Sequence, residues 1–189
     1  ITKCYGNSGL QEIFNKKGSV HTFKDKAYAN RFKMDGDLKK HSCKIWEIIN
    51  NIKKCKGLTF IYSEYREAGI LPLIFCLEME GYRKYKSDPV LKYPGKNKSN
   101  GFEYVVFGPE KDPYGRNSDH FKKLSKKDML KSNVKIIIGT RAASEGLSFY
   151  GIREIHILDP WHNMNRLEQA IGRGIRTLSH QELEPAKRN

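Results

Sequence analysis

The stretch that decides the fold covers residues 136–176 and reads IIIGTRAASEGLSFYGIREIHILDPWHNMNRLEQAIGRGIR. One apolar run, Ile136–Ile138, leads into a Gly-Thr turn, and a second, Ile155–Leu158, stops at Asp159-Pro160. Short apolar runs bounded by turn residues are typical of buried strands, and the segment that follows has helical spacing. We therefore predict two buried strands, each feeding a loop, and a helix after the second loop.

Two arginines near the end of this stretch are candidate ligands for phosphate. Arg173 and Arg176 are three residues apart, so on a helical turn they share one face. Gly172 beside them lets a backbone or a ligand approach closely. The guanidinium group is always charged, and its fork of N–H donors matches phosphate oxygens. The same pattern fits a solvated basic helix end facing the negative pole of the helix dipole, and the arginines alone favour that plainer interpretation.

Three segments resemble motifs of superfamily 2 helicases and translocases. Residues 139–149 (GTRAASEGLSF) resemble motif V, residues 169–176 (QAIGRGIR) resemble motif VI with its pattern Q-x-x-G-R-x-x-R, and residues 57–65 (GLTFIYSEY) resemble motif IV. The motifs occur in the family's order. The resemblance implies the second RecA-like domain of a two-domain motor, an α/β fold of three layers with a central parallel sheet and helices on both faces.

The resemblance also implies roles for individual residues. Arg173 and Arg176 would be arginine fingers on the γ-phosphate of ATP, and Gln169 would couple the nucleotide state to domain closure in the same cleft. The other residues expected at the nucleotide are Glu145, Gly146, Ser148 and Gly172, and those expected at the nucleic-acid backbone are Ser63, Thr140 and Arg141. Ser148 stands where many relatives have an acidic residue facing the ribose, so the chain departs from the family there.

Two patterns of the first domain of such a motor do not occur in this sequence, namely the phosphate loop G-x-x-x-x-G-K-[ST] and the D-E-x-x box that holds magnesium. The resemblance thus implies that ATP and Mg²⁺ are held mainly by an N-terminal RecA-like domain. We expect the chain alone to hydrolyse no ATP. Because it begins at Ile1, without a methionine, we expect it to be a piece of a longer protein.

Finer features are similar to ATPases of large DNA viruses, in particular the poxvirus-type early transcription factor and DNA-dependent nucleoside triphosphatase group. These features are the Ser-Glu-Gly of motif V, the strand end LDPWHN and the final RTLSHQELEPAKRN. They imply an intracellular motor, in host cytoplasm, viral factory or virion, with DNA favoured over RNA and a viral RNA polymerase as a further partner. The alternative is a non-catalytic nucleic-acid-binding or polymerase-docking module of a viral transcription factor.

The composition agrees with a phosphate-rich partner. The formal net charge is +14, and residues 83–135 hold 14 Lys and Arg against 6 Asp and Glu. Such a surface attracts nucleic acids or acidic membranes, although a lysine-rich composition that only aids solubility would look the same. No apolar run approaches the length of a membrane span. The four cysteines (Cys4, Cys43, Cys55, Cys76) have no C-x-x-C pairing, so we expect free thiols and no metal site.

Apolar spacing along the chain predicts alternating helices and strands, hence a parallel sheet. Residues 1–36 read as a partly irregular lead-in, 37–189 as the RecA-like domain, and 83–101 as a basic insertion forming a mobile loop. The expected helices are 38–54, 68–80, 120–131 and 163–171, and the expected strands are 58–62, 102–107, 134–138 and 153–158. Four tyrosines (Tyr62, Tyr65, Tyr82, Tyr85) fit either the core or the rim.

Overall fold

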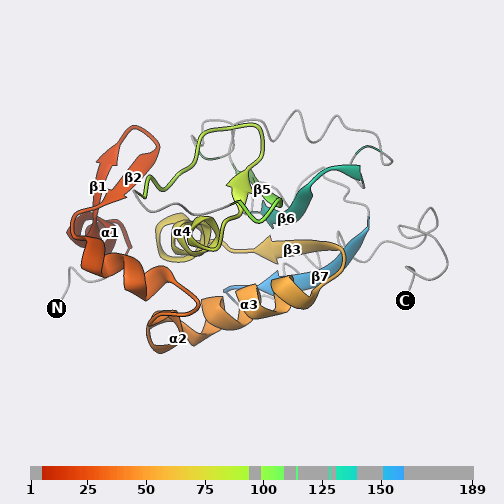
Figure 1. Ribbon diagram of the computed structural model, residues 1–189, viewed down its shortest axis with the longest axis horizontal. Coiled ribbons are helices and arrows are strands. Elements are labelled where there is room, and N and C mark those ends of the chain that lie inside the picture. Colours follow the sequence, from red (N-terminus) through yellow and green to blue (C-terminus); the bar gives the residue numbers. More distant parts are fainter. Residues whose placement is uncertain are drawn as a thin grey trace.

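The computed structural model describes residues 6–93, 99–108, 114, 128, 131–139 and 151–159. Within these ranges the chain forms a five-stranded sheet, a two-stranded hairpin and the helices that pack against them (Figure 1). In chain order the elements are α1 (Gly6–Ile13), β1 (Phe14–Lys17), β2 (Val20–Phe23), the 3₁₀ helix η1 (Lys26–Phe32), α2 (Leu38–His41), α3 (Cys43–Lys54), β3 (Leu58–Tyr62), the π-helical turn η2 (Arg66–Ile70), α4 (Leu71–Met79), β4 (Arg83–Lys84), β5 (Glu103–Phe107), β6 (Val134–Gly139) and β7 (Ile152–Ile157).

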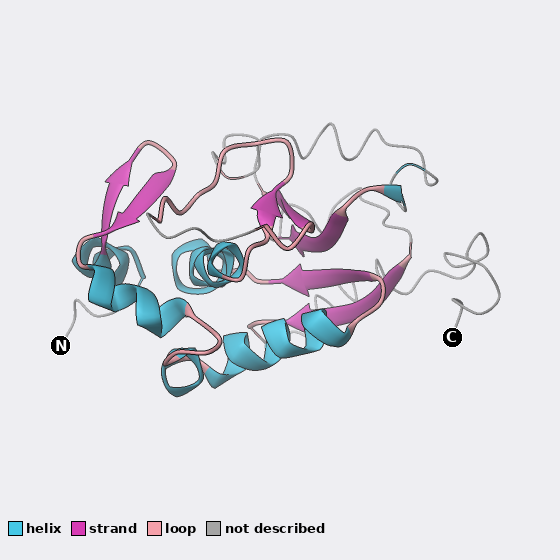
Figure 2. Ribbon diagram, viewed as in Figure 1, coloured by secondary structure: helices cyan, strands magenta, loops and turns pink. Residues whose placement is uncertain are grey.

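The central sheet is parallel throughout and has the strand order β4-β5-β6-β3-β7. Figure 2 shows its strands in magenta, with the long helix α3 running below them. Every residue of β3 is buried, as expected for a parallel strand covered on both faces. The predicted α/β fold with a parallel sheet is therefore confirmed.

The side chains of the sheet divide into two apolar clusters, one on each face. Ile61, Ile136 and Tyr104 point to the first face, where they pack with α3 and α4. Alternate residues such as Phe60 and Ile137 belong to the second cluster and are also buried. The two longer helices that pack on the sheet, α3 and α4, cover the first face. The helices expected for the second face, 120–131 and 163–171, fall almost entirely outside the described residues.

Two predicted helices differ from expectation, one by a break and one by its start. The helix expected at 38–54 is divided at Ser42, whose side chain accepts a hydrogen bond from the Ile45 backbone N–H at 3.3 Å and so caps α3. The helix expected from residue 68 begins earlier, as the π-helical turn η2 that runs into α4. None of the helices among the described residues is long and apolar enough to cross a membrane.

The segment before residue 37 is more ordered than the irregular lead-in we expected. It forms α1, the β1–β2 hairpin and η1, which lie at one end of the molecule beside α4 (Figure 1). Phe14 of β1 is 3% exposed, and its ring centroid lies 4.5 Å from that of Phe75 on α4. The hairpin is thus part of the main apolar core. Its short strands FNKK and VHTF carry too few apolar residues for a periodic signal.

We predicted a mobile loop at 83–101, and the structure corrects this prediction for residues 85–93, which we call the strap. Val90 and Leu91 are buried, and their backbone N–H groups donate to the Glu78 carboxylate at 2.9 and 2.6 Å. The Tyr104 hydroxyl donates to the same carboxylate at 2.5 Å. Burial raises the pKa of Glu78 above its ordinary value, since the charged form is desolvated. The strap is therefore a fixed part of the fold.

The strap also holds the hairpin. The backbone N–H of His21 donates to Val90 O at 2.7 Å, and the N–H of Lys92 donates to His21 O at 2.8 Å. The hairpin is thereby bonded to the strap, and the strap is bonded to Glu78 of α4. These partners are far apart in sequence, so no local sequence pattern predicts their contacts.

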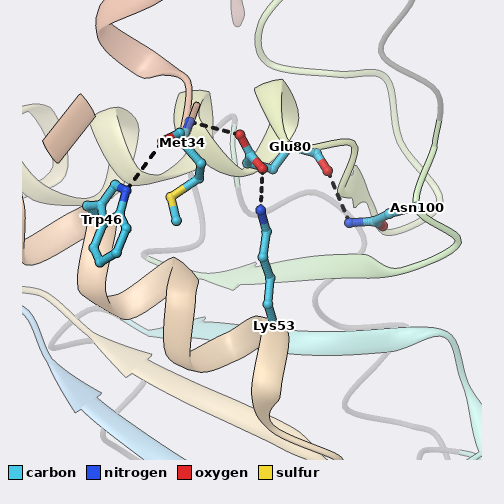
Figure 3. A network of polar contacts seen from close by, with 5 residues as sticks. All are labelled: Met34, Trp46, Lys53, Glu80 and Asn100. Atoms are coloured by element: carbon cyan, nitrogen blue, oxygen red, sulfur yellow. Dashed lines mark hydrogen bonds and ion pairs between the residues drawn. The ribbon is translucent and has the colours of Figure 1, made fainter. Parts of the chain in front are cut away.

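A second polar network surrounds Glu80, at the end of α4 (Figure 3). Its carboxylate accepts from the Met34 N–H at 3.0 Å and from Lys53 Nζ at 2.5 Å. Its backbone carbonyl accepts from Asn100 Nδ2 at 3.2 Å, and Trp46 Nε1 donates to Met34 O at 3.4 Å. One residue thus joins the N-terminal segment, α3, and the loop before β5.

Candidate functional site

The carboxyl ends of β3, β6 and β7 lie side by side. Tyr62 of β3 is in register with Gly139 of β6 and with Ile157 of β7. The pairing continues one residue further, because Ser63 N donates to Gly139 O at 3.1 Å and Leu158 N donates to Tyr62 O at 2.8 Å. Ligands of open parallel sheets bind at the carboxyl ends of the strands. This edge is the candidate site.

Ser63 and Asp159 form the polar centre of the edge. The Ser63 hydroxyl donates to Asp159 Oδ2 at 2.5 Å, and the backbone N–H of Glu64 donates to the same oxygen at 3.1 Å. Ser63 is fully buried. A hydroxyl has one proton, so in this arrangement Ser63 offers no donor to a phosphate. Its predicted contact with a nucleic-acid backbone would require Asp159 to release it.

Gly69 makes room for this pair. A Cβ at Gly69 would overlap the Ser63 Oγ and would lie 3.2 Å from Leu158 Cδ2. The glycine is buried within η2, so the close approach is a matter of packing and not of a left-handed backbone. The π-helical turn therefore brings the start of α4 directly against the Ser63–Asp159 hydrogen bond.

The end of β7 is also held by α3. Lys44 of α3 donates from Nζ to the Leu158 carbonyl at 2.8 Å. Leu158 is buried in the main core. Leu158 and Asp159 are thus fixed by contacts from both α3 and the β3–η2 connection. The chain that leads on to residues 160–176 leaves from a rigid point.

Most predicted site residues lie outside the described ranges. This holds for Thr140, Arg141, Glu145, Gly146, Ser148, Gln169, Gly172, Arg173 and Arg176. The structure does fix the two points from which their segments depart. Thr140 directly follows Gly139, and residue 160 directly follows Asp159, so both segments start beside Ser63 at one edge of the sheet. No group of His, Cys, Asp and Glu among the described residues could hold a metal ion.

Sequence reasoning missed two features of this edge. It did not assign a role to Asp159. A usable signal was present, because Asp159 directly follows one strand and the Ser63 hydroxyl directly follows another strand of the same sheet. It also left Tyr65 undecided between core and rim. The structure buries Tyr62, Tyr82 and Tyr85 but leaves Tyr65 55% exposed.

Comparisons with known proteins place this chain beside helicases and viral ATPases. A family model described as "Helicase conserved C-terminal domain" matches residues 110–177, which include both segments that depart from the edge. The chain is 30% identical over 148 residues to the "Putative ATP-dependent RNA helicase" of Acanthamoeba polyphaga mimivirus, covering 78% of this chain and 24% of that protein. It is 28% identical over 155 residues to "Nucleoside triphosphatase I" of Melanoplus sanguinipes entomopoxvirus, covering 80% and 20%.

A further relative is the "Termination factor NPH-I homolog" of African swine fever virus, 27% identical over 174 residues, with 78% of this chain and 24% of that protein covered. The chain thus spans about a quarter or less of the length of these curated relatives. The resemblance drawn from the three sequence motifs is confirmed.

Proposed function

Because this chain carries the C-terminal domain of a superfamily 2 helicase, similar to the ATPases of large DNA viruses, we propose that it is half of an ATP-driven motor acting on nucleic acid. The observation that carries the proposal is the family match over residues 110–177. It spans the two segments that leave β6 and β7 at one edge of the sheet. The partner half would be an N-terminal RecA-like domain holding ATP and Mg²⁺.

In this proposal the arginines Arg173 and Arg176 stabilise charge on the γ-phosphate during transfer. Phosphoryl transfer depends mainly on positioning and charge stabilisation, and a fixed guanidinium supplies both. Gln169 couples the nucleotide to closure of the two domains. The remaining nucleotide contacts are assigned to Glu145, Gly146, Ser148 and Gly172.

The nucleic-acid backbone would be held by Thr140 and Arg141, which follow β6, together with Ser63 when its hydroxyl is freed from Asp159. Contacts to the backbone carry no base sequence information. We therefore propose binding that tolerates any sequence and weakens with salt, in keeping with the net charge of +14.

We further propose that the motor acts on DNA in preference to RNA and that it works with the transcription machinery. The relative named as a termination factor supports the transcription setting, and the choice of DNA follows the likeness to ATPases of large DNA viruses. A viral RNA polymerase is the partner proposed, and an intracellular location follows from it.

The test uses the complete protein with its upstream domain. Arg176→Lys keeps the charge but loses the fork, so we expect kcat for ATP to fall by about 10³ to 10⁵ with a modest change in KM. Arg31→Lys is the matched control, because Arg31 lies 4.9 Å over the Tyr28 ring in the N-terminal segment. A folded Arg176→Lys protein with near-normal kcat would refute the finger role.

The chain of 189 residues alone is the second arm. It carries no phosphate loop, so we expect no ATP turnover. ATP turnover by the purified chain that disappears with Arg173→Ala would contradict the proposal that the N-terminal domain is needed to hold ATP and Mg²⁺.

A further inference from the structure

Tyr65 is a large aromatic side chain exposed at the candidate site. Among the described residues, the large hydrophobic side chains left exposed are Tyr65 at 55% and Phe102 at 43%. Tyr65 follows Ser63 by two residues, at the carboxyl ends of β3, β6 and β7. Phe102 directly precedes β5, so in a parallel sheet it lies at the opposite, amino-terminal edge.

The backbone of Tyr65 is held firmly although its ring is exposed. Its carbonyl oxygen accepts from the Gly69 N–H at 3.1 Å and from the Ile70 N–H at 3.0 Å. The residue also starts the η2 turn. The ring therefore projects from a fixed point, which lowers the entropy lost when a ligand covers it.

The ring does not serve the fold within the described part of the chain. It joins neither apolar cluster, whereas Tyr62, three residues earlier, is packed into one of them. The other exposed ring has a partner, because Lys135 Nζ lies 4.7 Å from the centroid of Phe102. An exposed, rigidly mounted aromatic beside a candidate phosphate-binding edge is the arrangement by which proteins stack on unpaired bases.

We propose that Tyr65 is a stacking platform for an unpaired base of the nucleic acid held at this edge. The inference rests on the proposed function and adds a substrate class to it, namely a single strand or a duplex opened at this point. In a paired duplex the base faces are covered by their neighbours, so a ring gains little there. The flat face of any base suits the ring, which keeps binding tolerant of sequence.

The size of the effect follows from what stacking contributes elsewhere. Alanine substitution at stacking positions weakens binding by about 5- to 150-fold for each base lost. Tyr65→Ala in the complete protein should therefore lower its affinity for a fluorescently labelled DNA single strand by that factor. Tyr65→Phe, which keeps the ring, should retain most of the affinity. Phe102→Ala is the matched control and should bind as the unaltered protein does.

Binding to a DNA strand that contains a run of abasic sites tests whether the ring contacts a base. The unaltered protein and Tyr65→Ala should bind this strand equally, because no base is present to stack. The KM for ATP should be the same in both proteins, since the ring is assigned to the strand and not to the nucleotide. Equal melting temperatures will show that an exposed substitution leaves the fold intact.

Several results would overturn the inference. Unchanged affinity of Tyr65→Ala for the normal strand would do so, as would an equal loss on the abasic strand. A loss confined to the KM for ATP would assign the ring to the nucleotide base instead. If the unaltered protein bound no nucleic acid at any salt concentration, the proposed function would fall together with the stacking role, whereas unchanged Tyr65→Ala binding removes only the latter.

Discussion

Replacement of Gly69 by alanine should destabilise the protein, against the usual effect of this change. In a helical turn alanine is normally favoured over glycine by about 1 kcal/mol. Here a Cβ would overlap the Ser63 hydroxyl oxygen and crowd Leu158. Overpacking of a core typically costs about 1–3 kcal/mol, and loss of a hydrogen bond to a charged acceptor costs about 1.5–3 kcal/mol. We expect a net loss of about 2–5 kcal/mol in the free energy of unfolding.

The measurement is a double-mutant cycle by urea denaturation. Ser63→Ala removes the oxygen that the new Cβ would meet, and it also removes the hydrogen bond to Asp159. Gly69→Ala should therefore cost less in the Ser63→Ala background, with a coupling of about 1–3 kcal/mol. A Gly69→Ala protein as stable as the unaltered one, or strictly additive costs, would refute the packing we describe.

Three further predictions concern the strap and the surface charge. Because burial raises the pKa of Glu78, the folded state holds its proton more tightly than the unfolded state, so this group's contribution to stability falls as pH rises above its ordinary value of 4.5. Glu78→Gln should remove that fall. The measurement is the unfolding free energy of both proteins over a pH series, in which the difference between them should change with pH. A difference that is the same at every pH would contradict the prediction. Leu91→Ala should cost about 2–5 kcal/mol by urea denaturation, as for a core leucine, whereas a mobile loop would give almost no change. Binding of the complete protein to duplex DNA should weaken linearly in log affinity against log salt, and a flat response would exclude backbone contacts as its source.

The sequence predicted the central strands well because their information is local. Residues 58–62 and 134–138 are mainly apolar, with Thr59 and Lys135 as the exceptions, and both strands lie within one residue of the predicted bounds. A near-continuous apolar run is typical of a strand covered on both faces. The four isoleucines of α3 repeat at helical spacing, and all are buried.

The strap and the hairpin escaped prediction because their information is not local. The strap has no aliphatic residues besides Val90, Leu91 and Pro89, and its anchor is the carboxylate of Glu78 on another element. The Ser63–Asp159 hydrogen bond joins residues 96 positions apart. The arginine fingers came from resemblance alone, since two arginines at helical spacing fit an ordinary solvated helix equally well.

The position of β3 within the sheet has a consequence for synthesis on the ribosome. β3 lies between β6 and β7, yet it is the first strand of this sheet to be made, and β7 ends only at Ile157. At about 5–20 residues per second, roughly 5–20 seconds pass before its last neighbour exists. During that interval the mainly apolar strand β3 has open edges, with which other chains can pair. Newly made chains should thus depend on a chaperone that binds residues 58–62, and stalling before residue 152 should favour aggregation.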